Sequence, residues 1–178
     1  GSEMCIRDRC KNLIRIFFLQ EAAKKLKWKD SDFPPTMVSN TVVVGSGTMG
    51  GGICQWLASR NIKVLLKDIS PELIGSSLAK IGKLFTQGVL KFKFDRPAAR
   101  KSISNITTTV NDISLKNKDL IIEAITENFN IKSSVLSQLE AKSSKDTIIA
   151  TNTSAISINK LAKKLKRPEN FIGIHFFN

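Results

Sequence analysis

Hydrophobic and polar positions alternate along most of the chain in blocks that fit short buried strands and helices in turn. Continuous apolar or β-branched runs predict strands at residues 41–45, 62–68, 106–109, 119–125, 146–154 and 170–178. Helical spacing of apolar residues predicts intervening helices over 51–60, 71–94, 130–143 and 157–166. Strands that alternate with helices pair in parallel through right-handed crossovers. The pattern therefore predicts an α/β fold, a doubly wound, mostly parallel sheet with helices on both faces.

The segment before this alternating region has a different pattern. Residues 10–36 contain helically spaced apolar positions, which predict an amphipathic helix over 12–28, and then a polar stretch with two consecutive prolines, which predicts a linker. The main domain is therefore expected over 37–178. Residues 1–9 fit native structure poorly, so we interpret them as a remnant of artificial or assembly origin and leave them out of the fold prediction.

Composition fits a single sizeable domain. The chain has 178 residues, of which 42% are hydrophobic and 24% charged. Its apolar runs are far shorter than a membrane span needs, and charges occupy the place of a secretory signal, so we expect no membrane span and a cytoplasmic protein, with a mitochondrial or peroxisomal location left open. The three cysteines lack metal-ligand spacing, so no metal site is predicted, and Cys54 is expected to be a core residue.

A formal net charge of +13 raises the question of an anionic partner. Nucleic acid, an anionic surface or a phosphorylated small molecule would each suit such a charge. The lysines are dispersed, however, and the chain has no tyrosine and no aromatic-rich RNA-binding signature. We therefore favour a solvated lysine-rich surface, with a phosphate-bearing substrate as the next interpretation and no nucleic-acid partner.

The stretch TVVVGSGTMGGGI, residues 41–53, places five glycines within eight positions at the end of a predicted strand. Gly45, Gly47 and Gly50 have the G-x-G-x-x-G spacing of a dinucleotide-binding turn. In such a turn the first glycine allows the tight bend, the second lets a pyrophosphate approach, and the third lets the helix pack on the strand. We expect Thr48 and Met49 between them to contact the cofactor as well, within a Rossmann-like fold.

Asp68 supplies the second requirement of a dinucleotide site, an acid at the end of the next strand. Its carboxylate can accept hydrogen bonds from the adenosine ribose and would repel a 2′-phosphate, which favours NAD over NADP. The alternative is a helix-capping acid before Ser70. Lys67 is adjacent, but strand alternation predicts that it points to the other face.

Three later segments, DLIIEAITEN, ATNTSAISI and FIGIHFFN, extend the pattern. Together with GSGTMGGGI and in this order, they resemble the 3-hydroxyacyl-CoA dehydrogenase family. The resemblance implies an NAD-dependent enzyme that oxidises (3S)-3-hydroxyacyl-CoA to 3-oxoacyl-CoA in fatty-acid β-oxidation. The segment NLIRIFFLQEAAKKL, the proline-containing linker and VLLKDIS resemble the region that joins hydratase and dehydrogenase parts in multifunctional fatty-acid oxidation proteins of the alpha-subunit type.

The resemblance also assigns catalytic roles. His175, the only histidine, matches the family's catalytic histidine, and an imidazole has the pKa range to take the proton of the 3-hydroxyl. Ser154 matches a serine that contacts the substrate, with an N-cap serine as the alternative. Asn178 matches an asparagine that orients the reacting groups. Asn152 has no clear placement, as a turn residue or a cofactor contact.

Glu127 and Lys132 match family positions near the nicotinamide ribose, so we expect both to bind the cofactor. The alternative is a surface ion pair, although a separation of five suits a helix poorly. Glu123 lies within a predicted strand and is expected to be structural or to support the site.

The resemblance implies parts that lie outside these residues. The family pairs its histidine with a glutamate and completes the acyl-CoA cleft and most of the dimer interface with a helical C-terminal domain, so we expect the 178-residue chain to be inactive alone. The complete protein is expected to be oligomeric, possibly with a thiolase subunit. The alternatives are a stand-alone 3-hydroxybutyryl-CoA dehydrogenase, a non-catalytic NAD-binding module and, from the charge alone, a nucleic-acid binder.

Overall fold

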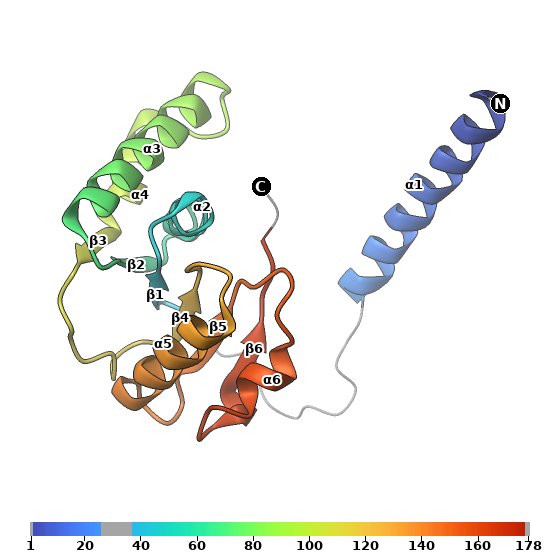
Figure 1. Cartoon of the computed structure of the whole chain (residues 1–178). Helices are drawn as coiled ribbons and strands as arrows, with labels where there is room; N and C mark the ends of the chain where they lie inside the picture. The colour runs from blue at the N-terminus through green and yellow to red at the C-terminus, as the bar shows by residue number, and fades with distance from the viewer. Residues whose placement is uncertain (1, 26–36, 177–178) are drawn as a thin grey trace. The chain divides into compact units, whose positions relative to one another are not determined.

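The computed structural model describes residues 2–25 and 37–176 and divides the chain into two compact units, Gly1–Thr36 and Met37–Asn178. In the first unit, α1 (Ser2–Lys25) is a single helix that begins inside the segment left out of the prediction (Figure 1). The large apolar residues between Leu13 and Leu19 are all exposed. At ~100° per residue they point all round the helix axis, so residues 13–19 do not form a one-sided apolar face. The end of the predicted helix, residues 26–28, and the predicted linker after it lie outside the described residues.

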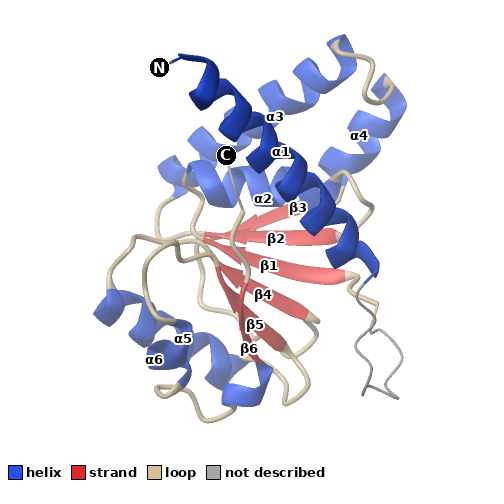
Figure 2. Cartoon of the chain, turned by 90° about the vertical axis from the view of Figure 1, so that its right-hand side faces the viewer, coloured by secondary structure: helices blue, strands red, loops and turns tan. Residues whose placement is uncertain are grey.

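The second unit contains a six-stranded sheet in the order β3-β2-β1-β4-β5-β6, and every pairing is parallel. The strands are β1 (Asn40–Val44), β2 (Lys63–Lys67), β3 (Ile106–Thr109), β4 (Leu120–Glu123), β5 (Ile148–Thr151) and β6 (Phe171–Gly173). Figure 2 shows the strands side by side in one sheet. The chain builds outward from β1 to β3 and then returns to build from β4 to β6, so the predicted doubly wound, Rossmann-like sheet is confirmed.

Alternating strand residues divide the core between the two faces of the sheet. Val43, Leu66 and Ile122 belong to a buried cluster with apolar residues of α2 (Thr48–Ala58), α3 (Pro71–Leu90) and α4 (Arg96–Ser104). Val42 and Ile121 belong to the cluster on the other face, under α5 (Phe129–Lys142). The short α6 (Ile158–Ala162) adds a third cluster beside α5. Helices therefore cover both faces (Figures 1 and 2), because neighbouring strand residues point to opposite sides.

The predicted helix over 71–94 is α3, which ends four residues before the predicted end, and α4 is a separate helix that follows outside that range. Ser70 caps α3 through its hydroxyl, and Pro71 occupies the first helical position. The helix ends at Leu90, because Phe92 takes a left-handed backbone with φ 53°. Asp95 then accepts a hydrogen bond from Ala98 N at 2.7 Å and starts α4, a helix that the sequence analysis missed.

The described residues contain no helix that is both long and apolar enough to span a bilayer. They also hold no group of three or more side chains that would suit a metal ion. Cys54 is fully buried, as predicted, and burial raises the pKa of its thiol to about 12.

Candidate active site

The carboxyl ends of the central strands lie at one edge of the sheet and bring the sequence-predicted residues together. The strand pairing continues one residue beyond the regular strands, through backbone hydrogen bonds from Gly45 N to Lys67 O and from Ala124 N to Val44 O, both at 2.8 Å. Asn152 N likewise donates to Glu123 O at 2.8 Å. In a doubly wound sheet, ligands bind outside this edge where the strand order reverses, here between β1 and β4.

The three fingerprint glycines have distinct reasons to be glycine. Gly45 has a φ of +97°, and a Cβ there would lie 2.7 Å from Ala124 O. A Cβ on Gly50 would lie 1.8 Å from Gly45 O, so the start of α2 packs directly on the turn. A Cβ on Gly47 would meet nothing within 4 Å. No protein atom packs against this side of Gly47, so its backbone is open to a ligand.

The N-terminal end of α2 offers free hydrogen-bond donors to that open space. Gly47 is its N-cap residue, without a side-chain cap, and the first turn carries no acidic residue. Thr48 is the first residue of the helix and is exposed, and Met49 follows it. Uncapped first-turn N–H groups and the positive end of the helix dipole suit an anion such as a pyrophosphate.

Asp68 lies against the glycine-rich turn, immediately after β2. Its Oδ2 accepts hydrogen bonds from Ser46 N at 2.5 Å and Ser46 Oγ at 2.6 Å, and Oδ1 accepts from Ile69 N at 2.7 Å. Partial burial would raise the pKa of Asp68, but these hydrogen bonds outweigh it and hold the pKa below its ordinary value. The alternative that Asp68 caps a helix is wrong, since Ser70 caps α3.

Two cavities follow the edge of the sheet and share Ala124 and Ile125 as a common wall. The larger, about 660 Å³, extends from Gly45, Gly47 and Asp68 toward apolar side chains of α5 and of the loop after β3. Lys67 lines it as well, together with residues of α5, and its ammonium donates to Asn111 O at 2.5 Å.

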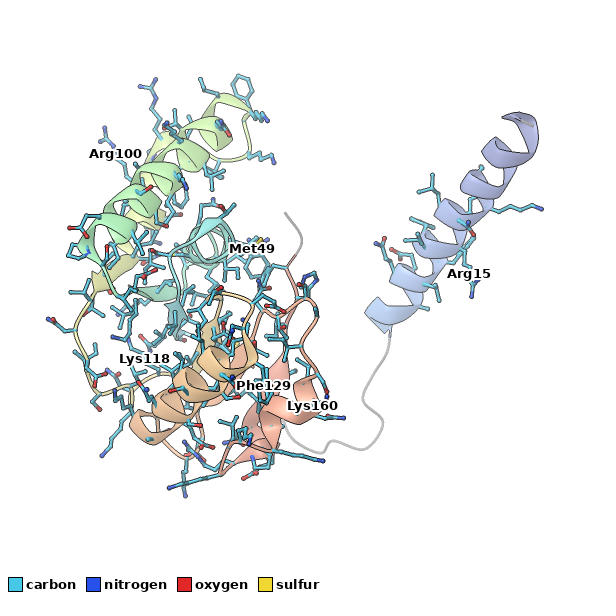
Figure 3. All side chains as sticks on the ribbon, viewed as in Figure 1. Arg15, Met49, Arg100, Lys118, Phe129 and Lys160 are labelled. Atoms are coloured by element: carbon cyan, nitrogen blue, oxygen red, sulfur yellow. The ribbon has the colours of Figure 1, made fainter. Side chains whose placement is uncertain are left out.

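The smaller cavity, about 310 Å³, brings the expected catalytic residues together. Ser154 and His175 line it with Asn152, Phe176, Glu127 and Met49. Met49, labelled in Figure 3, lies on α2, so residues far apart in the sequence meet there. Asn178, the third expected catalytic residue, is outside the described residues.

Hydrogen bonds to the last residue of β5 and to the residue after it fix the segment that carries His175. Ile174 N donates to Thr151 O at 3.0 Å, and Phe176 N donates to Asn152 Oδ1 at 2.8 Å. Asn152 therefore holds the backbone on the C-terminal side of the histidine, a role that the sequence left open. The Phe176 ring packs edge-on against Trp56 of α2, with ring centroids 5.8 Å apart.

Ser154 lies on the loop between β5 and α6. The alternative that it caps the following helix is wrong, because α6 starts later and Ser157 caps it. The loop is held by Glu127, whose Oε1 accepts hydrogen bonds from Thr153 Oγ1, Ser154 N and Ala155 N, the last two at 3.1 Å. The pKa of Glu127 is below its ordinary value, because these bonds and the Lys132 ammonium outweigh the opposing effect of burial.

Lys132 is not at the surface. Only 1% of its side chain is exposed, and Nζ lies 2.6 Å from Glu123 Oε1 and 3.5 Å from Glu127 Oε2. The alternative of a surface ion pair is therefore wrong. The separation of five residues does not prevent this ion pair, because the two residues do not lie on one helix. Glu127 precedes α5, and only Lys132 belongs to it.

Several residues of this region were missed at the sequence level, among them Ser46, Thr153, Ala124 and Phe176. Thr153 and Phe176 fall inside the motifs TNTS and HFFN, so the motif boundaries carried a usable signal. Ser46 stands between two fingerprint glycines, and nothing in its spacing indicates a bond to an acid 22 residues away.

Comparison with known proteins agrees with this geometry. Residues 40–178 match the family model described as the NAD-binding domain of 3-hydroxyacyl-CoA dehydrogenase. Fatty acid oxidation complex subunit alpha from Acinetobacter baylyi is 38% identical over 99% of this chain, and the protein of the same name from Idiomarina loihiensis is 36% identical over 96%. The chain spans 24% of the length of each.

Among solved structures, (S)-3-hydroxybutyryl-CoA dehydrogenase from Ralstonia eutropha superimposes with a TM-score of 0.77 at 35% identity. The similarity covers 80% of this chain and 50% of that one. The family match covers most of the chain, including the whole sheet and both cavities. The chain belongs to the family of 3-hydroxyacyl-CoA dehydrogenase NAD-binding domains.

Proposed function

We propose that residues 37–178 form a domain that binds NAD along the carboxyl edge of the sheet. The observation that carries the proposal is the open backbone at Gly47 beside the uncapped end of α2, with the Asp68 carboxylate next to it. In this arrangement the N–H groups of Thr48 and Met49 face the pyrophosphate, and Gly45 and Gly50 shape the turn.

The two cavities suit the two halves of the cofactor. Adenosine occupies the larger cavity, where Asp68 accepts its ribose hydroxyls and apolar side chains of α5 surround the base. The nicotinamide half occupies the smaller cavity beside Glu127, which accepts hydroxyls of the second ribose. A negative charge on Asp68 repels a 2′-phosphate, so NAD is preferred over NADP.

The smaller cavity also supports the chemistry of a 3-hydroxyacyl-CoA dehydrogenase in the complete protein. Bound NAD supplies the acceptor for the hydride that leaves C3 of the substrate. His175 takes the proton of the 3-hydroxyl, so that the C3–O bond becomes a carbonyl, and Ser154 donates a hydrogen bond that fixes the reacting oxygen. Asn178 orients these groups. The product is a 3-oxoacyl-CoA.

The parts of the proposal that concern the whole protein extend beyond this domain. We propose that it acts in fatty-acid β-oxidation as an alpha-type subunit, in an oligomer that includes a thiolase, and in the cytoplasm. The name of the long relatives, fatty acid oxidation complex subunit alpha, supports a role in fatty-acid oxidation as an alpha-type subunit of a complex. Size-exclusion chromatography of the complete protein with and without a thiolase subunit tests the assembly.

Calorimetric titration of the 178-residue chain with NADH, NADPH and ADP tests the cofactor proposal. We expect one site for NADH, weaker binding of NADPH, and a competing but weaker ADP. Equal affinity for NADH and NADPH would contradict the role of Asp68. To test the reaction, the complete protein is mixed with NAD and a 3-hydroxyacyl-CoA, and we expect NADH to form. If the protein binds NAD but forms no NADH, the alternative of a non-catalytic NAD-binding module is favoured.

A further inference from the structure

A buried group of three charged side chains lies behind the smaller cavity. The Lys132 ammonium lies 2.6 Å from Glu123 Oε1 and 3.5 Å from Glu127 Oε2, and it also donates to Ile125 O at 3.3 Å. The side chains of Lys132 and Glu123 are 1% and 0% exposed, whereas Glu127 is 39% exposed. Lys132 does not line either of the two cavities formed by the described residues, whereas Glu127 lines the smaller one.

Burial of this ion pair needs a reason other than stability. Removing an ammonium and a carboxylate from water costs free energy that their attraction only partly returns. An apolar pair of the same volume often stabilises a fold equally well or better. What an apolar pair lacks is direction. Lys132 contacts the carboxylate of Glu127, and Glu123 contacts Lys132, through charged groups 3.5 Å and 2.6 Å apart.

The same group holds the segment from Thr151 to Ala155 at both ends. Glu123 Oε2 accepts a hydrogen bond from Thr151 Oγ1 at 2.6 Å, at the end of β5. Glu127 Oε1 accepts from Ser154 N and Ala155 N in the loop that follows. The ion pairs therefore connect β4, α5 and the loop that carries Ser154, although none of the three charged groups touches the serine hydroxyl in this structure.

We propose that Glu123 and Lys132 are positioning residues that act through Glu127 to hold the Ser154 loop for the nicotinamide half of the site. The assignment rests on the proposed function, and it gives Lys132 a role different from the direct cofactor contact that the family resemblance implies. It predicts that loss of the Lys132 charge weakens binding of the nicotinamide half of the cofactor and not of the adenosine half. The larger cavity has its own polar group at Asp68 and is left unchanged.

The test compares Lys132→Met with two further variants of the 178-residue chain. Lys132→Met leaves Glu123 buried without its partner, so Glu123→Gln/Lys132→Met is included as a variant with no unpaired buried charge. Lys163→Met removes the same charge from an exposed position and serves as the matched control. NADH probes the whole site, and ADP probes the adenosine end alone.

We expect the double variant to bind NADH about 10-fold more weakly, with ADP affinity within about two-fold of the parent. The change in nicotinamide fluorescence that is expected when NADH binds the parent should be lost in the double variant. Backbone amide exchange, followed by NMR without ligand, should be faster at Ser154 and Ala155, whose N–H groups Glu127 accepts. Lys163→Met should match the parent in every measurement.

Two outcomes overturn the inference. One is unchanged exchange at Ser154 and Ala155 in a folded double variant, and the other is an equal loss of NADH and ADP affinity, which a general structural role would produce. If the parent chain does not bind NADH, the proposed function fails, and the exchange measurement still decides the positioning role by itself.

Discussion

Replacement of Gly47 by alanine separates ligand binding from folding. The backbone there has φ −62° and ψ −170°, a conformation that any residue adopts, and an added Cβ would meet no protein atom within 4 Å. The methyl group would instead project into the space where we place the pyrophosphate. The substitution therefore perturbs the cofactor site while it leaves the packing of the domain unchanged.

The expected effects differ in size between stability and binding. Alanine is a poorer N-cap than glycine by up to ~1 kcal/mol, and restriction of the unfolded chain returns ~0.4–1 kcal/mol, so the free energy of unfolding should change little. Loss of one charge-assisted hydrogen bond to the phosphate costs ~1.5–3 kcal/mol, which corresponds to about 10- to 150-fold in affinity for NADH.

The assay is calorimetric titration with NADH, with thermal unfolding measured on the same samples. Gly82→Ala, in the middle of α3 with open space around its Cβ, is the matched control and should raise the free energy of unfolding by about 1 kcal/mol without altering binding. Gly50→Ala, in contrast, would force a Cβ to 1.8 Å from Gly45 O and should destabilise the fold. A folded Gly47→Ala chain that binds NADH like the parent would refute the placement of the pyrophosphate.

The remaining predictions concern charged groups. Hydrogen bonds from Ser46 lower the pKa of Asp68, so its contribution to stability is present above the unfolded pKa and is lost as pH falls below about 4; acid unfolding should depend less on pH in Asp68→Asn, and an equal dependence would contradict this. Lys132→Met should lower the free energy of unfolding by ~3–5 kcal/mol, because it leaves the Glu123 carboxylate buried and unpaired; chemical denaturation measures this, and the additional Glu123→Gln change should recover part of the loss. His175→Ala in the complete protein should keep NADH affinity and reduce turnover about 10²- to 10⁴-fold, and a nearly normal rate would exclude a proton-transfer role.

The sequence predicted the sheet well because its signals are local. Each strand is a short apolar run, and the alternation between Val42 and Val43 across two core clusters follows from strand geometry alone. The helix pattern over 71–94 predicted α3 correctly but placed its end four residues too late, where one backbone angle matters. Lys91, Phe92 and Lys93 continue a helical spacing, and only the left-handed conformation of Phe92 ends it.

The candidate site was predicted only as far as motifs reach. The glycine-rich turn and Asp68 have defined spacing, and the structure places them side by side. The hydrogen bond from Ser46 to Asp68 and the ion pair between Glu123 and Lys132 join residues 22 and 9 positions apart from different elements. Such contacts depend on strand order and on the path of the β4–α5 loop, which no local pattern contains.

The most direct test of the account is calorimetric titration of the folded 178-residue chain with NADH. We expect one saturable site, competition by ADP, and a binding heat that is strongly reduced in Gly47→Ala. A chain that is folded by circular dichroism but shows no heat at millimolar NADH would contradict the central claim that this edge of the sheet binds a dinucleotide.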